Sequence, residues 1–145
     1  MRAANYVVLS VRVLALVSAC GESPTAPTPN VAFSTTDVRV GTGAEAVTGK
    51  VVTAHYTGWL YDSSKTDQKG IQFTSSLGTT GFAWMVGAGE VIEGMDRGVT
   101  GMKAGGLRRI VIPPDLAYGN ERNGPIPPNS TLIFELDLLA VADAQ

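Results

Sequence analysis

The sequence predicts an α+β domain in which a curled antiparallel β-sheet wraps around one short α-helix. The chain of 145 residues contains 17 glycines and 8 prolines, which indicate many turns between short elements. Several segments alternate apolar and polar residues, as half-buried strands do, and one segment repeats apolar residues at helical spacing. Several strands and one short helix can share a single core only if the sheet curls around the helix.

Residues 1–19 have the features of a secretory signal peptide. A basic start precedes short apolar runs, and the small residues Ser18 and Ala19 stand directly before Cys20. Small residues before a cysteine resemble the lipobox of bacterial lipoproteins. The resemblance implies that Cys20 becomes a lipidated N-terminus and anchors an exported protein in the cell envelope, on the periplasmic side of a Gram-negative membrane. The alternative is an ordinary cleaved signal with a chance cysteine, or a poorly placed start codon. Two departures from the lipobox pattern motivate it: Val17 stands where leucine is commonest, and Arg12 shortens the apolar stretch.

Residues 20–34 are predicted to hold the lipidated cysteine and a tether to the folded domain. Pro24, Pro27 and Pro29 lie among serines and threonines, a composition that favours an extended, solvated chain over a packed one. The folded domain is therefore assigned to residues 35–145.

Two strands are expected in the first part of the domain. Thr36–Val40 is a short extended segment that ends at a glycine-rich turn. Lys50–Leu60 alternates, so that Val52, Ala54 and Tyr56 share one face. These three residues are therefore candidates for the core side of the sheet.

A polar loop over Tyr61–Gly70 separates these strands from the rest of the sheet. Pro113 and Pro114 stop the strand expected at Leu107–Ile112, because proline cannot donate to a strand ladder. Further strands are expected at Gln72–Thr74, Phe82–Val86, Leu107–Ile112 and Thr131–Leu139.

One helix is expected before Gly105 and Gly106, which close it. Its glycines, among them Gly94 and Gly98, lower helix propensity, so the helix must be short and held by packing. Acidic residues lie early and Lys103 lies late, which favours the helix dipole. Its apolar residues recur at spacings of three to four: Val91, Met95, Val99 and Met102.

The composition excludes several classes of function. The formal net charge of −2, from 11 basic and 13 acidic residues, gives no electrostatic footprint for nucleic acid. A single cysteine and a single histidine exclude a disulfide framework and a Cys/His zinc cluster. We therefore expect no nucleic-acid partner, no metal and no cofactor. The histidine, His55, points away from Tyr56 and is interpreted as structural.

Four segments, in this order, resemble the FKBP-type peptidyl-prolyl cis/trans isomerases: His55–Gly58, Gly87–Gly94, Ile112–Gly119 and Ile126–Phe134. Each segment is a weak signal alone, but together they span about 100 residues. The resemblance implies an FKBP-like fold and an enzyme that accelerates X–Pro bond rotation in exported polypeptides without covalent chemistry. It also implies proline-containing polypeptides as substrates and a monomeric state.

The same resemblance implies the site residues. The rings of Tyr56, Phe82 and Phe134 would surround the prolyl ring together with Met95. The backbone N–H of Ile92 and the hydroxyl of Tyr118 would donate to substrate carbonyls. The full set of implied pocket residues is Tyr56, Phe73, Phe82, Val91, Ile92, Met95, Tyr118 and Phe134.

Three positions depart from the family pattern. Thr74 stands where the Phe-Asp motif has aspartate, Met95 stands where tryptophan usually forms the pocket floor, and Pro125 stands at a usually aliphatic position. Tyr61-Asp62 looks like the same motif, but it leaves no residues for the usual turn, so Phe73-Thr74 is taken as the match. The departures motivate an alternative function, a catalytically weak proline-peptide-binding or chaperone-like module.

Overall fold

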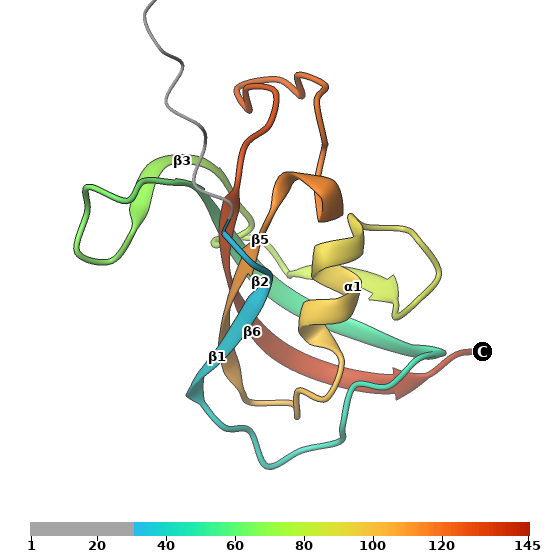
Figure 1. Cartoon of the computed structure of the whole chain (residues 1–145). Helices are drawn as coiled ribbons and strands as arrows, with labels where there is room; N and C mark the ends of the chain where they lie inside the picture. The colour runs from blue at the N-terminus through green and yellow to red at the C-terminus, as the bar shows by residue number, and fades with distance from the viewer. Residues whose placement is uncertain (1–30) are drawn as a thin grey trace, which may run out of the picture.

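The computed structural model describes residues 31–145 (Figure 1). The predicted signal peptide, Cys20 and most of the tether lie outside the described residues. The elements follow in chain order: β1 (Ser34–Arg39), β2 (Lys50–Tyr61), β3 (Lys69–Ser75), β4 (Phe82–Met85), α1 (Glu93–Val99), β5 (Leu107–Ile112), the 3-10 turn η1 (Pro114–Leu116) and β6 (Leu132–Asp143).

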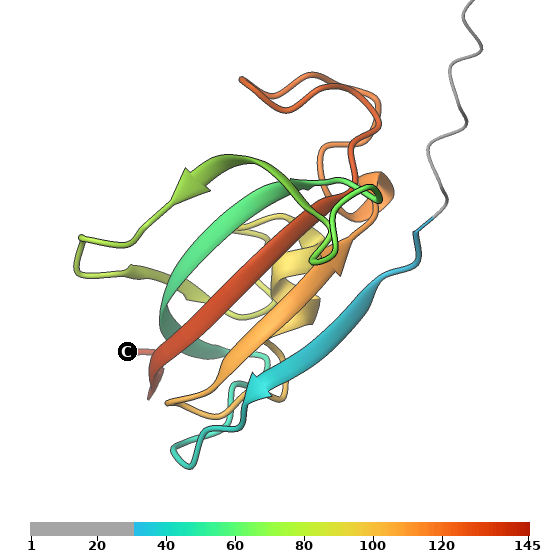
Figure 2. The same cartoon turned by 90° about the vertical axis from the view of Figure 1, so that its left-hand side faces the viewer.

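The strands form one antiparallel sheet in the order β1-β5-β6-β2-β3, and β4 pairs with β2 outside this path. The sheet curls, and α1 lies on its concave side (Figures 1 and 2). This arrangement confirms the predicted fold class. The long pair β2·β6 forms the centre of the sheet, with register from Lys50↔Asp143 to Leu60↔Leu132.

Two short strands share the free edge of β2, and this division positions the site. β4 pairs with Val51–Ala54, whereas β3 pairs with residues from Thr57 to Tyr61. Tyr56 lies on β2 at the point where one partner strand gives way to the other. In the ladders that β2 forms with β3 and β4, Tyr56 therefore has no partner residue.

Two glycines let α1 approach β5 closely. A Cβ on Gly94 would lie 2.3 Å from Cγ2 of Ile112, and one on Gly98 would lie 2.4 Å from Cδ1 of Ile110. Any larger side chain would therefore push the helix off the sheet. The prediction of a short helix held by packing is confirmed.

The predicted end of the helix at Gly105 is wrong. The helix ends at Val99, because Thr100 leaves the helical backbone with ψ 128° and Gly101 takes a left-handed φ of 84°. Lys103 therefore lies beyond the helix. Instead, the Arg108 guanidinium donates hydrogen bonds to the carbonyls of Gly98 and Thr100, at 2.9 and 3.0 Å.

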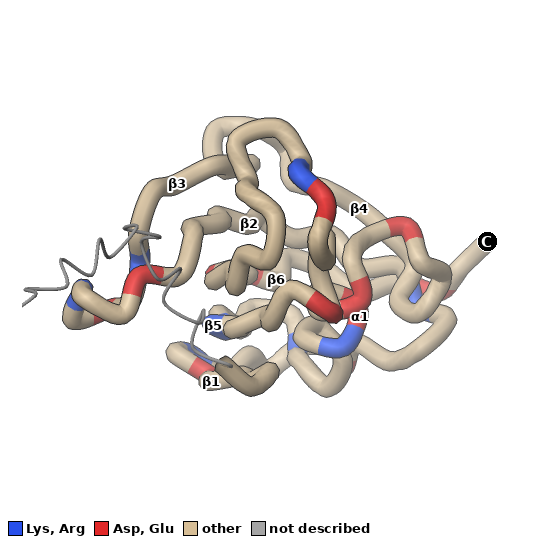
Figure 3. The backbone as a smooth tube through the Cα atoms, turned by 45° about the horizontal axis from the view of Figure 1, so that its top comes forward, with Lys and Arg blue, Asp and Glu red and all other residues tan. Residues whose placement is uncertain are grey.

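The charged residues are spread over the domain. Figure 3 shows lysines and arginines interspersed with acidic residues along the backbone. Within residues 31–145, no helix has the length and apolar character needed to cross a membrane.

Candidate active site

A cavity of about 490 Å³ opens on the concave side of the sheet. Residues from β2, β3, β4, α1, β6 and the loop after η1 line it, and all eight pocket residues implied by the sequence are among them. The other lining residues are Thr74, Glu90, Asn123, Pro125 and Ile126.

Four aromatic rings form the wall of the cavity. The Tyr56 ring packs edge-on against Phe82, with centroids 6.1 Å apart, and also contacts Phe134 at 6.3 Å. Phe73 packs edge-on against Phe134 at 5.6 Å. Such edge-to-face pairs are a favoured arrangement of aromatic rings. The wall is therefore one continuous aromatic surface drawn from four strands.

Strand register explains why these rings meet. Gly58 on β2 pairs with Phe134 on β6 and with Thr74 on β3. A Cβ on Gly58 would lie 2.8 Å from ring atoms of both Phe73 and Phe134. The two rings therefore use the space that this glycine leaves empty.

The floor of the cavity comes from α1 and the segment before it. Met95 is buried, with 5% of its surface exposed, and Val91 and Ile92 are half-buried. Ile92 lies immediately before the helix, and its carbonyl accepts hydrogen bonds from the N–H groups of Met95 and Asp96. Phe82, 42% exposed, stands at the rim. The cavity thus combines a buried floor with an accessible aromatic edge.

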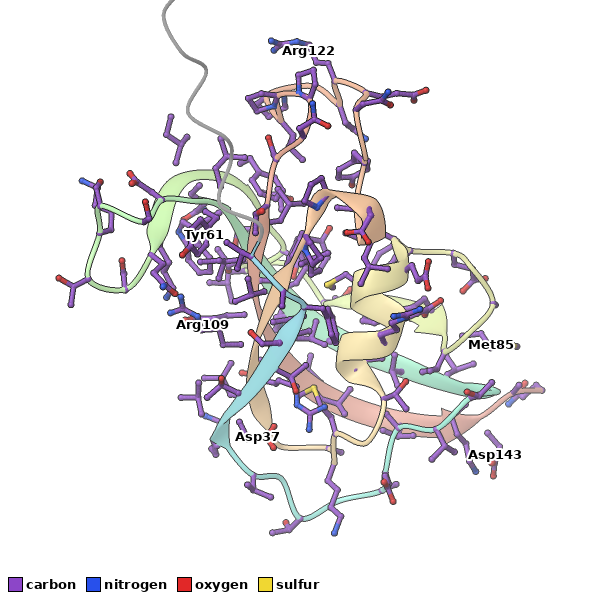
Figure 4. The ribbon with its side chains drawn as sticks, viewed as in Figure 1. Asp37, Tyr61, Met85, Arg109, Arg122 and Asp143 are labelled. Atoms are coloured by element: carbon purple, nitrogen blue, oxygen red, sulfur yellow. The ribbon has the colours of Figure 1, made fainter. Side chains whose placement is uncertain are left out.

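Tyr118 brings a hydroxyl to the cavity. Burial raises the pKa of this phenol above its ordinary value, and the nearby Tyr56 raises it further. The Tyr118 hydroxyl therefore stays protonated and can donate a hydrogen bond at neutral pH. The loop that follows projects beyond the body of the domain, with Arg122 near its far end (Figure 4).

Glu90 is the one charged residue among those that line the cavity. Its carboxylate accepts a hydrogen bond from the backbone N–H of Met85 at 2.7 Å, so part of its hydrogen-bonding capacity is used to hold its own loop. Within residues 31–145, no cluster of three or more His, Cys, Asp or Glu side chains could hold a metal ion.

The structure separates the two sequence segments that resemble the Phe-Asp motif. Phe73 and Thr74 line the aromatic cavity, whereas Asp62 and Ser63 line a different cleft of about 340 Å³ beside Pro128. The other two departures, Met95 and Pro125, also line the aromatic cavity. All three altered positions are thus placed to affect whatever binds there.

Sequence reasoning did not single out three lining residues. Glu90 and Ile126 lie inside segments that carried the family resemblance, so that signal could have identified them. Asn123 lies in a loop without periodicity and had no such signal. His55 lies outside the cavity, where its Nδ1 is 3.1 Å from the Ser76 carbonyl oxygen.

Comparisons with known proteins identify what this domain is similar to. A family model described as FKBP-type peptidyl-prolyl cis-trans isomerase matches residues 43–139. An FK506-binding protein of Neisseria meningitidis is 46% identical over 107 residues, a match that covers 72% of this chain and 92% of that protein. FK506-binding protein 1 of Aspergillus oryzae is 43% identical over 105 residues, covering 70% and 90%. By contrast, the chain spans only 24% of the 46 kDa FK506-binding nuclear protein of Spodoptera frugiperda, which it matches at 47% identity over 70% of its own length.

Solved structures show the same architecture. FkpA from Escherichia coli superposes with a TM-score of 0.65 at 34% identity, and the match covers 78% of this chain and 49% of that one. AtFKBP13 superposes with a TM-score of 0.64 at 36% identity, covering 76% and 93%.

Proposed function

Because the chain belongs to the FKBP-type peptidyl-prolyl cis-trans isomerases, we propose that it accelerates rotation about X–Pro peptide bonds in exported polypeptides. The observation that carries this proposal is the cavity walled by Tyr56, Phe73, Phe82 and Phe134, whose rings pack edge-on around an apolar floor. A prolyl ring is apolar and compact, and such a cavity can accept it.

An apolar cavity can catalyse this rotation without covalent chemistry. Rotation about a peptide bond has a barrier of about 18–20 kcal/mol, and an unaided X–Pro bond isomerises over tens to hundreds of seconds. In the twisted transition state the amide loses resonance, and its carbonyl depends less on hydrogen bonds from water. A dry cavity therefore stabilises the twisted amide relative to the planar, solvated one.

Individual residues have distinct roles in this proposal. Tyr56, Phe82 and Phe134 surround the prolyl ring with Met95 beneath it. The N–H of Ile92 and the hydroxyl of Tyr118 donate to substrate carbonyls. The raised pKa of Tyr118 supports its part, because a protonated phenol is the donor form.

A protease-coupled assay with a proline tetrapeptide tests the proposal, using the chain from Gly21 onward. We expect turnover above buffer and a loss of at least about tenfold in kcat/KM for Phe82→Ala, because this variant removes one ring of the cavity wall. The Phe82 side chain is exposed at the rim, so its removal should do little damage to the core. Leu77→Ala is the matched control, since this exposed side chain lies outside the cavity. Phe134→Ala should also lower activity, but this ring is buried, so its removal would also destabilise the core.

The same experiment separates the alternative function. Binding of the peptide with no turnover above buffer would reject the enzyme and favour a proline-peptide-binding module. The altered positions Thr74, Met95 and Pro125 motivate that outcome. We further propose that the protein is a monomer, as the family resemblance implies, and light scattering of the purified protein checks this.

We also propose that the protein is exported and anchored by a lipid on Cys20. The proposal rests on the small residues before this cysteine and on the proline-containing segment after it. In a bacterial host, the full chain should incorporate radiolabelled palmitate and sediment with membranes, and Cys20→Ala should do neither. Membrane association of the Cys20→Ala protein would reject the lipid anchor without bearing on the isomerase activity.

A further inference from the structure

Asp96 on α1 ties three segments together beneath the cavity. Its Oδ1 accepts a hydrogen bond from the indole Nε1–H of Trp84 at 3.2 Å, and its Oδ2 accepts one from the backbone N–H of Gly89 at 3.3 Å. Trp84 lies on β4, and Gly89 lies in the loop that joins β4 to α1. One carboxylate therefore fixes the strand, the loop and the helix relative to one another.

Trp84 connects this carboxylate to the aromatic wall. The indole is buried, with 2% of its surface exposed, and is the largest fully buried side chain of the domain. Its ring stacks on Phe82, with centroids 5.8 Å apart and planes at 30°. Phe82 in turn packs edge-on against Tyr56. The orientation of the indole thus bears directly on the rim of the cavity.

The loop held by Asp96 also carries part of the floor. Val91 and Ile92 follow Gly89 by two and three residues and both line the cavity. Glu90 holds the same loop to β4 through the N–H of Met85. Two carboxylates therefore restrain the backbone that leads into Val91 and Ile92.

The floor residue Met95 makes such restraint necessary. Methionine has three rotatable side-chain bonds and adapts its shape, so it defines a pocket less sharply than a rigid ring does. Trp84 is a rigid ring in the same buried core cluster as Met95, and its hydrogen-bond partner, Asp96, is the next residue after Met95. A fixed pocket shape matters, because small misplacements of binding groups lower catalytic rates strongly.

We propose that Trp84 and Asp96 are a pair of positioning residues that hold the aromatic rim and the Val91–Ile92 backbone in the shape that binds a prolyl ring. Neither residue lines the cavity, and both act through residues that do. The inference rests on the proposed isomerase function for its catalytic consequence, and its structural part is independent of catalysis.

The test uses Asp96→Asn, because an amide oxygen can accept one of the two hydrogen bonds but the amide nitrogen cannot accept the other. The matched control is Glu93→Gln, which removes a carboxylate from the same helix. Glu93 is ion-paired with Arg97 and is exposed on the surface. Trp59→Phe is the common background, since it leaves Trp84 as the single tryptophan of the chain.

Hydrogen exchange gives the readout that needs no turnover. In the Trp59→Phe background, the indole N–H of Trp84 gives one resolved NMR signal. We expect Asp96→Asn to speed exchange of this proton or of the Gly89 amide about tenfold or more, and Glu93→Gln to leave both unchanged. Unchanged exchange at both protons in Asp96→Asn would overturn the proposal.

Kinetics give the second readout. We expect Asp96→Asn to lower kcat/KM about fivefold, the effect of one lost hydrogen bond, with Glu93→Gln within about twofold of its parent. In a Trp84→Phe background, Asp96→Asn should change the logarithm of kcat/KM by less than half as much as it does with Trp84 present, because the two residues act as a pair. Equal losses in both backgrounds would show that Asp96 does not act through Trp84.

Failure of the inference and failure of the proposed function are distinguishable. An active parent whose Asp96→Asn variant is equally active and only less thermally stable would reject positioning and retain the isomerase. An inactive parent whose exchange rates still rise in Asp96→Asn would reject the isomerase and retain the structural pair. The effect of the pair on the cavity would then be measured as the affinity of the protein for the proline tetrapeptide.

Discussion

The ring of Phe73 stands edge-on against the ring of Phe134, with centroids 5.6 Å apart and planes at 85°. The two phenylalanines come from β3 and β6, which do not pair with each other but lie on either side of β2. Gly58 on β2 separates them, and only its lack of a side chain lets the rings meet. The aromatic wall thus depends on a residue that contributes no side chain to it.

Gly58→Ala should therefore damage the cavity. The new Cβ would lie 2.8 Å from Phe73 and Phe134 and 2.9 Å from Cγ2 of Thr74, so that the rings must shift. We expect kcat/KM to fall about tenfold and the free energy of unfolding in urea to fall by ~1–3 kcal/mol. Adding Phe73→Leu should recover stability but not activity. Full activity of Gly58→Ala would show that the rings do not need this space.

Thr74→Asp should raise the isomerase activity. Thr74 is half-buried in the wall of the same cavity as Tyr56, and a carboxylate there could accept a hydrogen bond from the Tyr56 hydroxyl and hold its ring. We expect a gain of about threefold in kcat/KM, within the range of one hydrogen bond. Thr74→Val, which has the same size and no acceptor, should show no gain. An unchanged rate for Thr74→Asp would reject this role for residue 74.

The strands show how far sequence patterns reach. The strand that the sequence predicts at Leu107–Ile112 has the same first and last residues as β5, because two prolines end it. The last strand was predicted to end at Leu139, yet β6 continues to Asp143. The register between β2 and β6 shifts at this point, so that Leu139 is an extra residue without a partner on β2. Such a bulge interrupts the alternation by which a strand is recognised.

The helix shows the opposite error. Apolar spacing continues through Met102, which is buried, although the helix has already ended at Val99. A turn through Gly101 brings Met102 back to the core at the spacing that a further helical turn would give. Periodicity reports which residues are buried and does not distinguish these two backbones.

The site residues could be predicted where they lie on strands or beside the helix. The loop after η1 is different, because local hydrogen bonds fix its shape. Asn123 and Ile126 exchange two backbone hydrogen bonds, at 3.1 and 2.8 Å, in a tight turn that places both against the cavity. The pairing of Trp84 with Asp96 is equally invisible in sequence, since twelve residues separate them.

Asp37 should make the stability of the domain depend on acid pH. Arg108 donates hydrogen bonds to both Asp37 oxygens, at 2.6 and 3.3 Å, and these lower the pKa of the carboxyl below its ordinary value. A carboxyl with a lowered pKa in the folded state stabilises above its unfolded pKa, about 3.9, and this stabilisation is lost as the pH falls through the folded pKa. The stabilisation is therefore present at pH 5–7 and fades below pH 4.

Asp37→Asn tests this linkage. Since Asp37 is 43% exposed, we expect a loss of no more than ~1 kcal/mol in the free energy of unfolding at pH 7. The difference from the parent should shrink at pH 3. Asp115→Asn, which removes an exposed carboxylate in η1, is the control and should leave stability unchanged at both pH values. A difference for Asp37→Asn that is the same at pH 3 and pH 7 would contradict the linkage.

The activity should be independent of pH from 6 to 9, because Tyr118 keeps its proton throughout this range. Burial and the neighbouring Tyr56 raise the pKa of the Tyr118 phenol above its usual value of about 10, so the donor form persists until more alkaline pH. Exchange NMR on a proline peptide measures the rate without a coupling protease.

Tyr118→Phe retains the ring and should lower kcat/KM about fivefold at every pH in this range. A decline of the parent rate between pH 8 and 9 that is absent from Tyr118→Phe would mean that the phenol ionises there, contrary to the effect of its burial.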